Sequence, residues 1–296
     1  MKNISPQHIQ PFNGNAEPST LIKIRGAYST FQKAEQRIAN VISKNPEEVI
    51  GLSITELAEK SETSESSVVR FCKSIGYRGY YELKISLARE LVVSPQQIYE
   101  EIGLKDDLAT VKHKVFQSTI LALQETIKIL NDRELEKAVE AICQAGLLAF
   151  YGMAASAAVA LDSSHKFLRI NIRSVSYSDS HMQAISASLL REGDVAFGIS
   201  HSGSSKDVVD ALRIARQSGA TTICLTHHTK SPITKVADIK LFTAARETAL
   251  RSDAMTSRIA ELSILDVLYV GVALRRYEVS LKSIERTKEA LAEKKY

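Results

Sequence analysis

Five short apolar runs separated by amphipathic segments constrain the fold of this chain more than any other feature. They begin at Leu147 and read LLAFY, IRSVSYS, VAFGIS, TTICLT and IKLFT. Each run is nearly continuously apolar or β-branched, which is typical of strands that are buried on both faces of a parallel sheet. Helical segments between such strands form the crossover connections of a covered sheet. The sequence therefore predicts a doubly wound α/β domain with five parallel strands.

The part of the chain before this domain has a different pattern. Residues 21–92 have helical periodicity with no convincing strand, and a Ser-Pro break follows them. The predicted organisation is a flexible tail at 1–20, a helical domain at 21–92, a linker at 93–112, the α/β domain at 113–280, and a C-terminal helix at 281–296.

Composition places the chain among ordinary globular proteins. Its 296 residues are enough for two domains, with 44% hydrophobic and 24% charged residues. The net charge of +4 permits a nucleic-acid partner without requiring one. Cys72, Cys143 and Cys224 are dispersed and flanked by apolar residues, as in reduced proteins. With no signal-like start and no apolar run of about 18 residues, we expect a cytoplasmic protein without a membrane span.

Two short helices separated by a tight polar turn are predicted between Ser53 and Gly76. Ser53 is followed three residues later by Glu56, which gives a capping box for the first helix. Thr63 or Ser64 can cap the second helix, and Gly76 can end it. The inward-facing residues of the second helix are Val68, Val69, Phe71, Cys72 and Ile75. This pattern is typical of a helix-turn-helix.

Charge is distributed unevenly over the same segment. It is acidic up to Glu65, whereas residues 66–89 hold five cations and one acid. The cations therefore lie on and after the second helix, where the phosphate backbone of a DNA duplex would lie. The predicted DNA-binding residues are Ser64, Ser66, Ser67, Arg70, Lys73 and Arg78. The alternative interpretation is a helical bundle with a solvated basic face.

Small polar residues follow three of the predicted strands, in GMAASAAVA, DSHMQA and HSGSSKDVV. In a doubly wound sheet, ligands bind beyond the carboxyl ends of the strands, where loops meet helix N-termini. Small side chains let backbone N–H groups approach a ligand, and helix N-termini favour anions. Hydroxyl donors are available from Ser156, Ser200, Ser202 and Ser205, with Lys206 as a nearby cation. The loops therefore predict a phosphate site, and the alternative is that these serines only cap helices.

Other sites built on glycine or serine loops lack their motifs here. GMAASA has one glycine where the GxGxxG of a dinucleotide site has three, and no GKS or GKT follows. ISHSGSS does not supply the GxSxG of a serine-hydrolase elbow. No Cys or His pair has the spacing of a zinc site. We therefore expect no cofactor and no metal.

The quoted segments resemble a known pair of domains. FYGMAASAAVALD, SYSDSHMQAISASLL, GDVAFGISHSGSSKDVVDAL and TAARETALRSDAMTSRIAELSILDVLYVG resemble the sugar isomerase (SIS) domain. KAEQRIANVI and SITELAEKSETSESSVVRFCKSIGYRGYYELK resemble the winged helix-turn-helix of RpiR-type regulators. Together they cover roughly residues 20–280. The resemblance implies an all-α winged helix-turn-helix-like domain followed by a doubly wound, five-stranded SIS domain that senses a phosphosugar.

The resemblance also assigns site residues. The family loop GxGxS matches Gly152, Ala154 and Ser156, with alanine in place of the second glycine. The family loop SxSGxT matches Ser200, Ser202, Gly203 and Ser205, where serine keeps the hydroxyl of threonine. Glu247 falls near a sugar-contacting position. The implied phosphosugar-binding residues are Gly152, Ser156, Ser200, Ser202, Gly203, Ser205 and Glu247.

The main functional alternative is a phosphosugar isomerase, which needs a general base. The available groups are His181, His201, Glu247 and Glu261, and none stands in a motif that demands catalysis. His227 and His228 are expected in a surface loop. Since an isomerase has no use for a basic helix-turn-helix, we expect a DNA-binding regulator of sugar metabolism genes and no enzyme. The resemblance favours a repressor, and a protein-interaction module is the third alternative.

The expected partners are double-stranded operator DNA, a phosphosugar effector and further copies of this chain. A helix-turn-helix reads half-sites in pairs, so we expect a homodimer or homotetramer. The segment SRIAELSILDVLYVGVAL is apolar on most sides, and is predicted to be a helix in the core or partly in a subunit interface.

Overall fold

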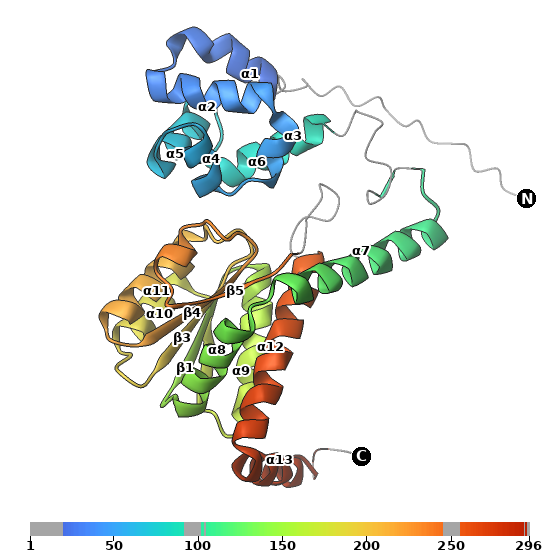
Figure 1. The fold of residues 1–296 in the computed structure, drawn as a ribbon, viewed down its shortest axis with the longest axis vertical. Helices are drawn as coiled ribbons and strands as arrows, with labels where there is room; N and C mark the ends of the chain where they lie inside the picture. The colour runs from blue at the N-terminus through green and yellow to red at the C-terminus, as the bar shows by residue number, and fades with distance from the viewer. Residues whose placement is uncertain (1–19, 92–101, 104, 245–254, 293, 295–296) are drawn as a thin grey trace, which may run out of the picture.

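The computed structural model describes residues 20–91, 102–103, 105–244, 255–292 and 294 (Figure 1). The expected N-terminal tail up to residue 19, half of the expected linker and Glu247 lie outside the described residues. The described part forms a helical unit and an α/β unit. The helical unit lies beyond one end of the strands.

The helical unit consists of α1 (Thr20–Ala27), η1 (Tyr28–Thr30), α2 (Lys33–Lys44), α3 (Pro46–Gly51), α4 (Ile54–Lys60), α5 (Glu65–Ser74) and α6 (Tyr80–Leu91). Its core includes Ile38, Leu57, Phe71 and Leu83, all fully buried. Burial of each such side chain stabilises the fold by roughly 1.5–3 kcal/mol. The structure describes only helices between residues 20 and 91, so no strand forms a wing within that range.

The predicted helix-turn-helix corresponds to α4 and α5. The capping box is present, because Ser53 N donates to Glu56 Oε2 at 2.6 Å and Glu56 N donates to Ser53 Oγ at 3.2 Å. Ser64 is the cap of α5, and its Oγ accepts from Ser67 N at 3.2 Å. Gly76, with φ at 91°, follows α5 in the left-handed region that glycine adopts without strain.

The α/β unit contains all five predicted strands. They are β1 (Leu148–Gly152), β2 (Ser174–Tyr177), β3 (Val195–Ile199), β4 (Thr221–Thr226) and β5 (Ile239–Phe242). All neighbouring pairs are parallel, and the strand order is β2-β1-β3-β4-β5. The expected doubly wound parallel sheet is therefore confirmed.

Helices cover both faces of this sheet (Figure 1). One face packs against α8 (Asp132–Gln144), α9 (Ala155–Arg169) and α12 (Met255–Arg275), through core residues such as Phe150, Phe167 and Leu268. The other face packs against α10 (Ser180–Ser188), α11 (Lys206–Gln217) and the 3-10 turn η2 (Ile233–Lys235). α7 (Leu108–Ile129) packs against α12, and α13 (Tyr277–Ala292) follows α12 at the C-terminal end.

α7 begins at Leu108, within the stretch that the sequence suggested as a linker. Asp107 caps it by accepting from Thr110 N at 2.8 Å. The three cysteines are free thiols, and burial raises the pKa of Cys72 and of Cys224 to about 12. Among the described helices, none is long and apolar enough to cross a membrane.

Candidate functional site

The sheet reverses its direction of strand addition between β1 and β3. In an open parallel sheet of this order, the loops after those two strands diverge and leave a crevice for a ligand. Gly152 and Ile199 are register partners at the carboxyl ends of β1 and β3. The predicted residues from 152 to 156 and from 200 to 205 therefore lie on adjacent loops at this switch point. We refer to residues 200–205 as the serine loop.

The loop after β1 brings the backbone very close to the start of α9. A Cβ on Gly152 would lie 2.5 Å from the carbonyl oxygen of Ser156, so only glycine fits. Ser156 is buried in the first turn of α9. Ala154 precedes that helix with φ 50° and ψ −123°, a conformation that favours glycine. The backbone at position 154 thus has a conformation suited to glycine, although this chain has alanine there.

The serine loop is held by its own hydroxyl groups. Ser200 is buried, and its Oγ donates to Ser205 Oγ at 3.0 Å. Ser202 Oγ accepts from Ser204 N at 3.2 Å. Gly203 has φ 63°, and a Cβ there would lie 2.9 Å from Thr226 Oγ1 and even closer to Ser231 Oγ. The loop therefore packs tightly against the segment that follows β4.

The alternative that the small polar residues only cap helices holds for one of the three loops. Asp179 caps α10 by accepting from Met182 N at 2.9 Å. In contrast, neither Ala154 at α9 nor Ser205 at α11 makes a side-chain capping bond. The first N–H groups of these two helices thus have no capping side chain, and helix N-termini of that kind favour an anion.

His201 of the serine loop lies beside two further histidines, His227 and His228. The His201 and His227 rings stack with centroids 5.1 Å apart, and the His227 and His228 rings meet edge to face at 4.9 Å. Burial, reinforced by the neighbouring histidines, lowers the pKa of His201 and of His228 to about 3. His228 is only 9% exposed, so the expectation of a surface loop was wrong for this residue. The reason is that the helical unit covers it.

The candidate general bases do not gather around the serine loop as a set. His181 is exposed on α10, Glu261 is fully buried on α12, and Glu247 lies outside the described residues. His201 is neutral near pH 7 because of its lowered pKa. Among the described residues, no group of three or more His, Cys, Asp or Glu side chains is arranged to hold a metal ion.

The predicted DNA-binding residues lie on one side of α5 and on the turn after it. Ser64, Ser66, Arg70, Lys73 and Arg78 are exposed. The remaining member, Ser67, is buried; its Oγ accepts from Arg70 Nη2 at 3.1 Å and lies 2.9 Å from Ser64 Oγ. Ser67 therefore positions its neighbours from inside the turn instead of facing a duplex.

Comparisons with known proteins agree with these two units. Residues 19–94 match the helix-turn-helix domain of the rpiR family, and residues 141–271 match the SIS domain. An HTH-type transcriptional regulator of Caldanaerobacter subterraneus subsp. tengcongensis is 44% identical over 93% of this chain and 98% of its own length. The HTH-type transcriptional regulator HexR of Pseudomonas aeruginosa is 36% identical over 93% of this chain and 96% of its own.

A solved structure extends the similarity to the whole architecture. The Vibrio vulnificus NanR protein complexed with ManNAc-6P has a TM-score of 0.80 and 28% identity, over 94% of this chain and 100% of that one. The sugar isomerase domain of an RpiR transcription factor from Sphaerobacter thermophilus has a TM-score of 0.55 and 27% identity, over 60% of this chain and 98% of that one.

The fold and these matches define a DNA-binding transcriptional regulator, built from a helix-turn-helix unit and a SIS domain. The chain belongs to the RpiR family of HTH-type regulators. The expectation of a regulator over a phosphosugar isomerase is thereby confirmed, since the relatives are named as regulators.

Proposed function

We propose that this chain is a repressor of sugar metabolism genes whose SIS domain senses a phosphorylated sugar. The observation that carries the proposal is the register of Gly152 with Ile199, which puts two loops of small polar residues at the switch point of the sheet. The effector phosphate would be held by Gly152, Ser156, Ser200, Ser202, Gly203 and Ser205. Glu247 remains a proposed sugar contact.

The electrostatics of the site suit a phosphate held by neutral donors. Two helices, α9 and α11, begin at these loops without a capping side chain, so their N–H groups and dipoles can face an anion. Lys206 is exposed and paired with Asp210 at 2.9 Å, so it does not dominate the site. The ManNAc-6P in the NanR complex supports a phosphosugar as the ligand class.

For DNA, the proposed contacts are Ser64, Ser66, Arg70, Lys73 and Arg78, with Ser67 in a supporting position. The exposed cations would neutralise phosphates, and the residues at the start of α5 would approach base edges. Because such a unit reads paired half-sites, we propose that the chain acts as a homodimer or homotetramer.

The deciding experiment is fluorescence anisotropy of labelled duplex DNA from upstream of this protein's own gene. Protein is titrated at two salt concentrations, with and without a pool of pentose, hexose and amino-sugar phosphates. We expect salt-sensitive binding that is stronger than to random DNA and that the pool weakens. Specific binding that no member of the pool changes would contradict the sensing role.

Two variants separate the two activities. Arg70→Ala removes a phosphate contact, so DNA affinity should fall about tenfold while the pool still raises the melting temperature of the protein. Ser202→Ala should keep DNA affinity and lose the response to the pool. The matched controls are Arg25→Ala on α1 and Ser188→Ala on α10, both at exposed positions. Loss of both activities in both variants would contradict this division.

A further inference from the structure

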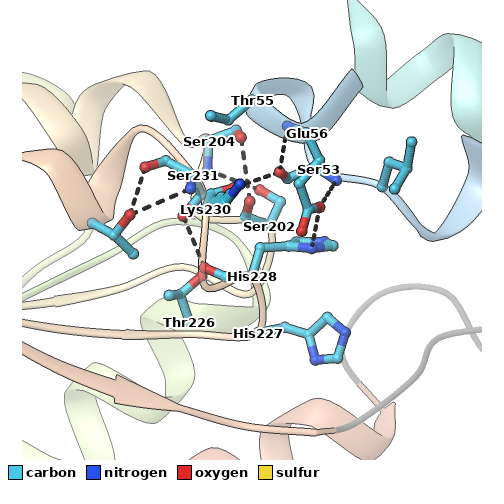
Figure 2. Close-up of polar contacts among 12 residues, drawn as sticks. Ser53, Thr55, Glu56, Ser202, Ser204, Thr226, His227, His228, Lys230 and Ser231 are labelled. Carbon is cyan, nitrogen blue, oxygen red and sulfur yellow. Dashed lines mark hydrogen bonds and ion pairs between the residues drawn. The ribbon is translucent and has the colours of Figure 1, made fainter. Parts of the chain in front are cut away.

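The helix-turn-helix unit contacts the SIS domain of the same chain through acidic residues of α4 and α5. Figure 2 shows the part of this interface around Ser53, Glu56, His228 and Lys230. Lys230 Nζ lies 2.7 Å from Glu59 Oε2, and Lys235 Nζ lies 2.7 Å from Glu65 Oε1. Ser53 Oγ donates a hydrogen bond to the Lys230 carbonyl oxygen. We refer to residues 227–235, which carry both lysines, as the docking loop.

These contacts set a definite arrangement of charge. Burial alone would raise the pKa of Glu65, but hydrogen bonds from Lys235 and Thr55 outweigh it and lower the pKa. His228 Nδ1 lies 3.5 Å from Glu56 Oε2 in the same interface. The acidic half of the helix-turn-helix thus faces a basic loop, which is complementary in sign.

The interface is polar and incompletely filled. A cavity of about 480 Å³ lies between the two units, lined by Thr55 and Glu59 on one side and by residues of the SIS domain on the other. The latter include Arg216, Lys230, Lys235 and Lys240. Lys230 and Glu59 are each more than half exposed, so their pair contributes little on its own. Such an interface can form and separate reversibly.

Docking holds Glu65, at the start of α5, against the docking loop. In helix-turn-helix complexes, the first residues of the second helix reach base edges inside a groove about 12 Å wide. Glu65 is the first residue of α5, and in this structure it is bound to the docking loop. Ser64 and Ser66 stay exposed beside Glu65, so a duplex that approaches the start of α5 would meet the docking loop at Glu65.

We propose that the basic docking loop of the SIS domain is a binding surface for the acidic face of α4 and α5, and that this docking competes with operator DNA. The docked form then does not bind DNA. The apparent DNA affinity is the intrinsic affinity multiplied by the fraction of molecules that are undocked.

The docking loop is also joined to the serine loop. Ile233 N donates to the Gly203 carbonyl oxygen at 2.9 Å, and His227 N donates to the His201 carbonyl oxygen at 3.0 Å. Thr226 Oγ1 donates to the same His201 oxygen at 3.2 Å. A phosphate bound at the serine loop would therefore contact residues that are hydrogen-bonded to the docking loop, and the docking loop in turn contacts the helix-turn-helix unit. This link between phosphate binding and docking rests on the proposed function, whereas the docking itself does not.

The test is the DNA affinity of full-length Lys230→Glu/Lys235→Glu. This variant has a net charge lower by four, which by long-range attraction alone would weaken DNA binding. Docking predicts the opposite sign, namely DNA binding about three- to tenfold tighter, because both ion pairs become repulsive. The matched control is Lys128→Glu/Lys282→Glu, with the same change of charge at exposed positions of α7 and α13. This control should bind DNA as tightly as the wild type or more weakly.

A charge swap and a measurement without DNA complete the design. Adding Glu59→Lys/Glu65→Lys to the first variant restores opposite charges, so its DNA affinity should fall below that of Glu59→Lys/Glu65→Lys alone. In amide hydrogen exchange of the DNA-free protein, residues 53–59 and 227–235 should exchange faster in Lys230→Glu/Lys235→Glu than in wild type. Unchanged exchange, or DNA affinity no higher than in the control, would overturn the proposal.

The pool of pentose, hexose and amino-sugar phosphates tests the link to the serine loop. Its effect on DNA affinity should shrink at least threefold in Lys230→Glu/Lys235→Glu, because the docked state through which it acts is depleted. An undiminished effect would overturn this link. A pool that leaves the wild type unaffected would instead count against the proposed sensing function, and the exchange measurement would still decide the docking.

Discussion

At the residue scale, the backbone of Ala154 stands out. Its φ of 50° and ψ of −123° fall where residues with a Cβ are strained, at a cost of order 1–3 kcal/mol. The tight approach of Gly152 to Ser156 fixes the chain on both sides of it. The alanine therefore sits in a conformation that the loop imposes.

Replacing this alanine should stabilise the protein. Ala154→Gly relieves the strained φ, and we expect the free energy of unfolding to rise by about 1 kcal/mol even after the added flexibility of the unfolded chain. Ala158→Gly, at an exposed position inside α9, should lower it by about 1 kcal/mol. Urea titrations of both variants measure the two values. A free energy of unfolding that falls in both variants would show that Ala154 is not strained.

Two histidines with lowered pKa values should make stability depend on pH. The pKa of His201 and of His228 is lowered to about 3, against about 6.5 for an unfolded histidine. Between these values the unfolded chain binds protons that the folded chain does not, so stability falls as pH falls from 6.5 towards 3. The slope is at most about 1.4 kcal/mol per pH unit for each histidine.

Thermal unfolding at pH 6.5 and 5.0 measures this effect above the range where most carboxylates titrate. His201→Asn/His228→Asn should flatten the difference between the two pH values. The control His113→Asn, at an exposed position of α7, should keep the wild-type difference. An equal pH dependence in all three proteins would mean that His201 and His228 titrate normally.

At the element scale, Gly203 joins the serine loop to the docking loop. It has φ 63°, and a Cβ would overlap Ser231. Gly193 has φ 85°, but its Cβ would meet no atom within 4 Å. Both alanine variants carry the strain of a positive φ, which is about 1–2 kcal/mol. Gly203→Ala should cost at least about 1 kcal/mol more than Gly193→Ala in chemical denaturation, because the docking loop must also move. Equal costs would show that the two loops are not rigidly packed.

The sequence predicted those elements whose signals are local. The five strands are continuous apolar runs, and the capping box of Ser53 and Glu56 requires only neighbours three residues apart. The position of His228 could not be predicted, because α4, about 170 residues earlier, covers it. Likewise, the sequence did not show that Ser67 turns inward, since Arg70 and Ser64 satisfy its hydroxyl only in the folded turn.

Site prediction had a similar limit. Loops rich in serine suggested a ligand, yet only the strand order brings Gly152 and Ser200 to adjacent positions at the switch point. Strand order depends on which runs pair, and five apolar runs of similar composition do not specify that from sequence alone. The acidic start of the helix-turn-helix was evident as a charge pattern, whereas its basic partner loop required the tertiary structure.

At the scale of the whole molecule, α12 has two apolar sides. One side is core, with Ile264, Leu268 and Val272 buried, as the sequence predicted for part of this helix. The other side exposes Val267, Val270 and Leu274, each at 50% or more. α9 packs against α12 and exposes Leu161 and Leu168. Exposed apolar side chains on two helices that pack together are typical of a subunit interface.

This surface gives the proposed oligomer a specific test. Val270→Glu/Leu274→Glu introduces two charges where a second copy would pack, so the mass from light scattering or sedimentation should fall to that of the 32.6 kDa monomer. The fold should persist because both positions are exposed. Leu189→Glu, on the opposite face of the sheet at α10, serves as the control and should leave the mass unchanged. Monomers should also lose the affinity advantage of a duplex with two half-sites over one with a single half-site, since that advantage comes from linking two DNA-binding units. A variant that remains an oligomer with this advantage intact would place the interface on another surface and leave the exposed side of α12 without this role.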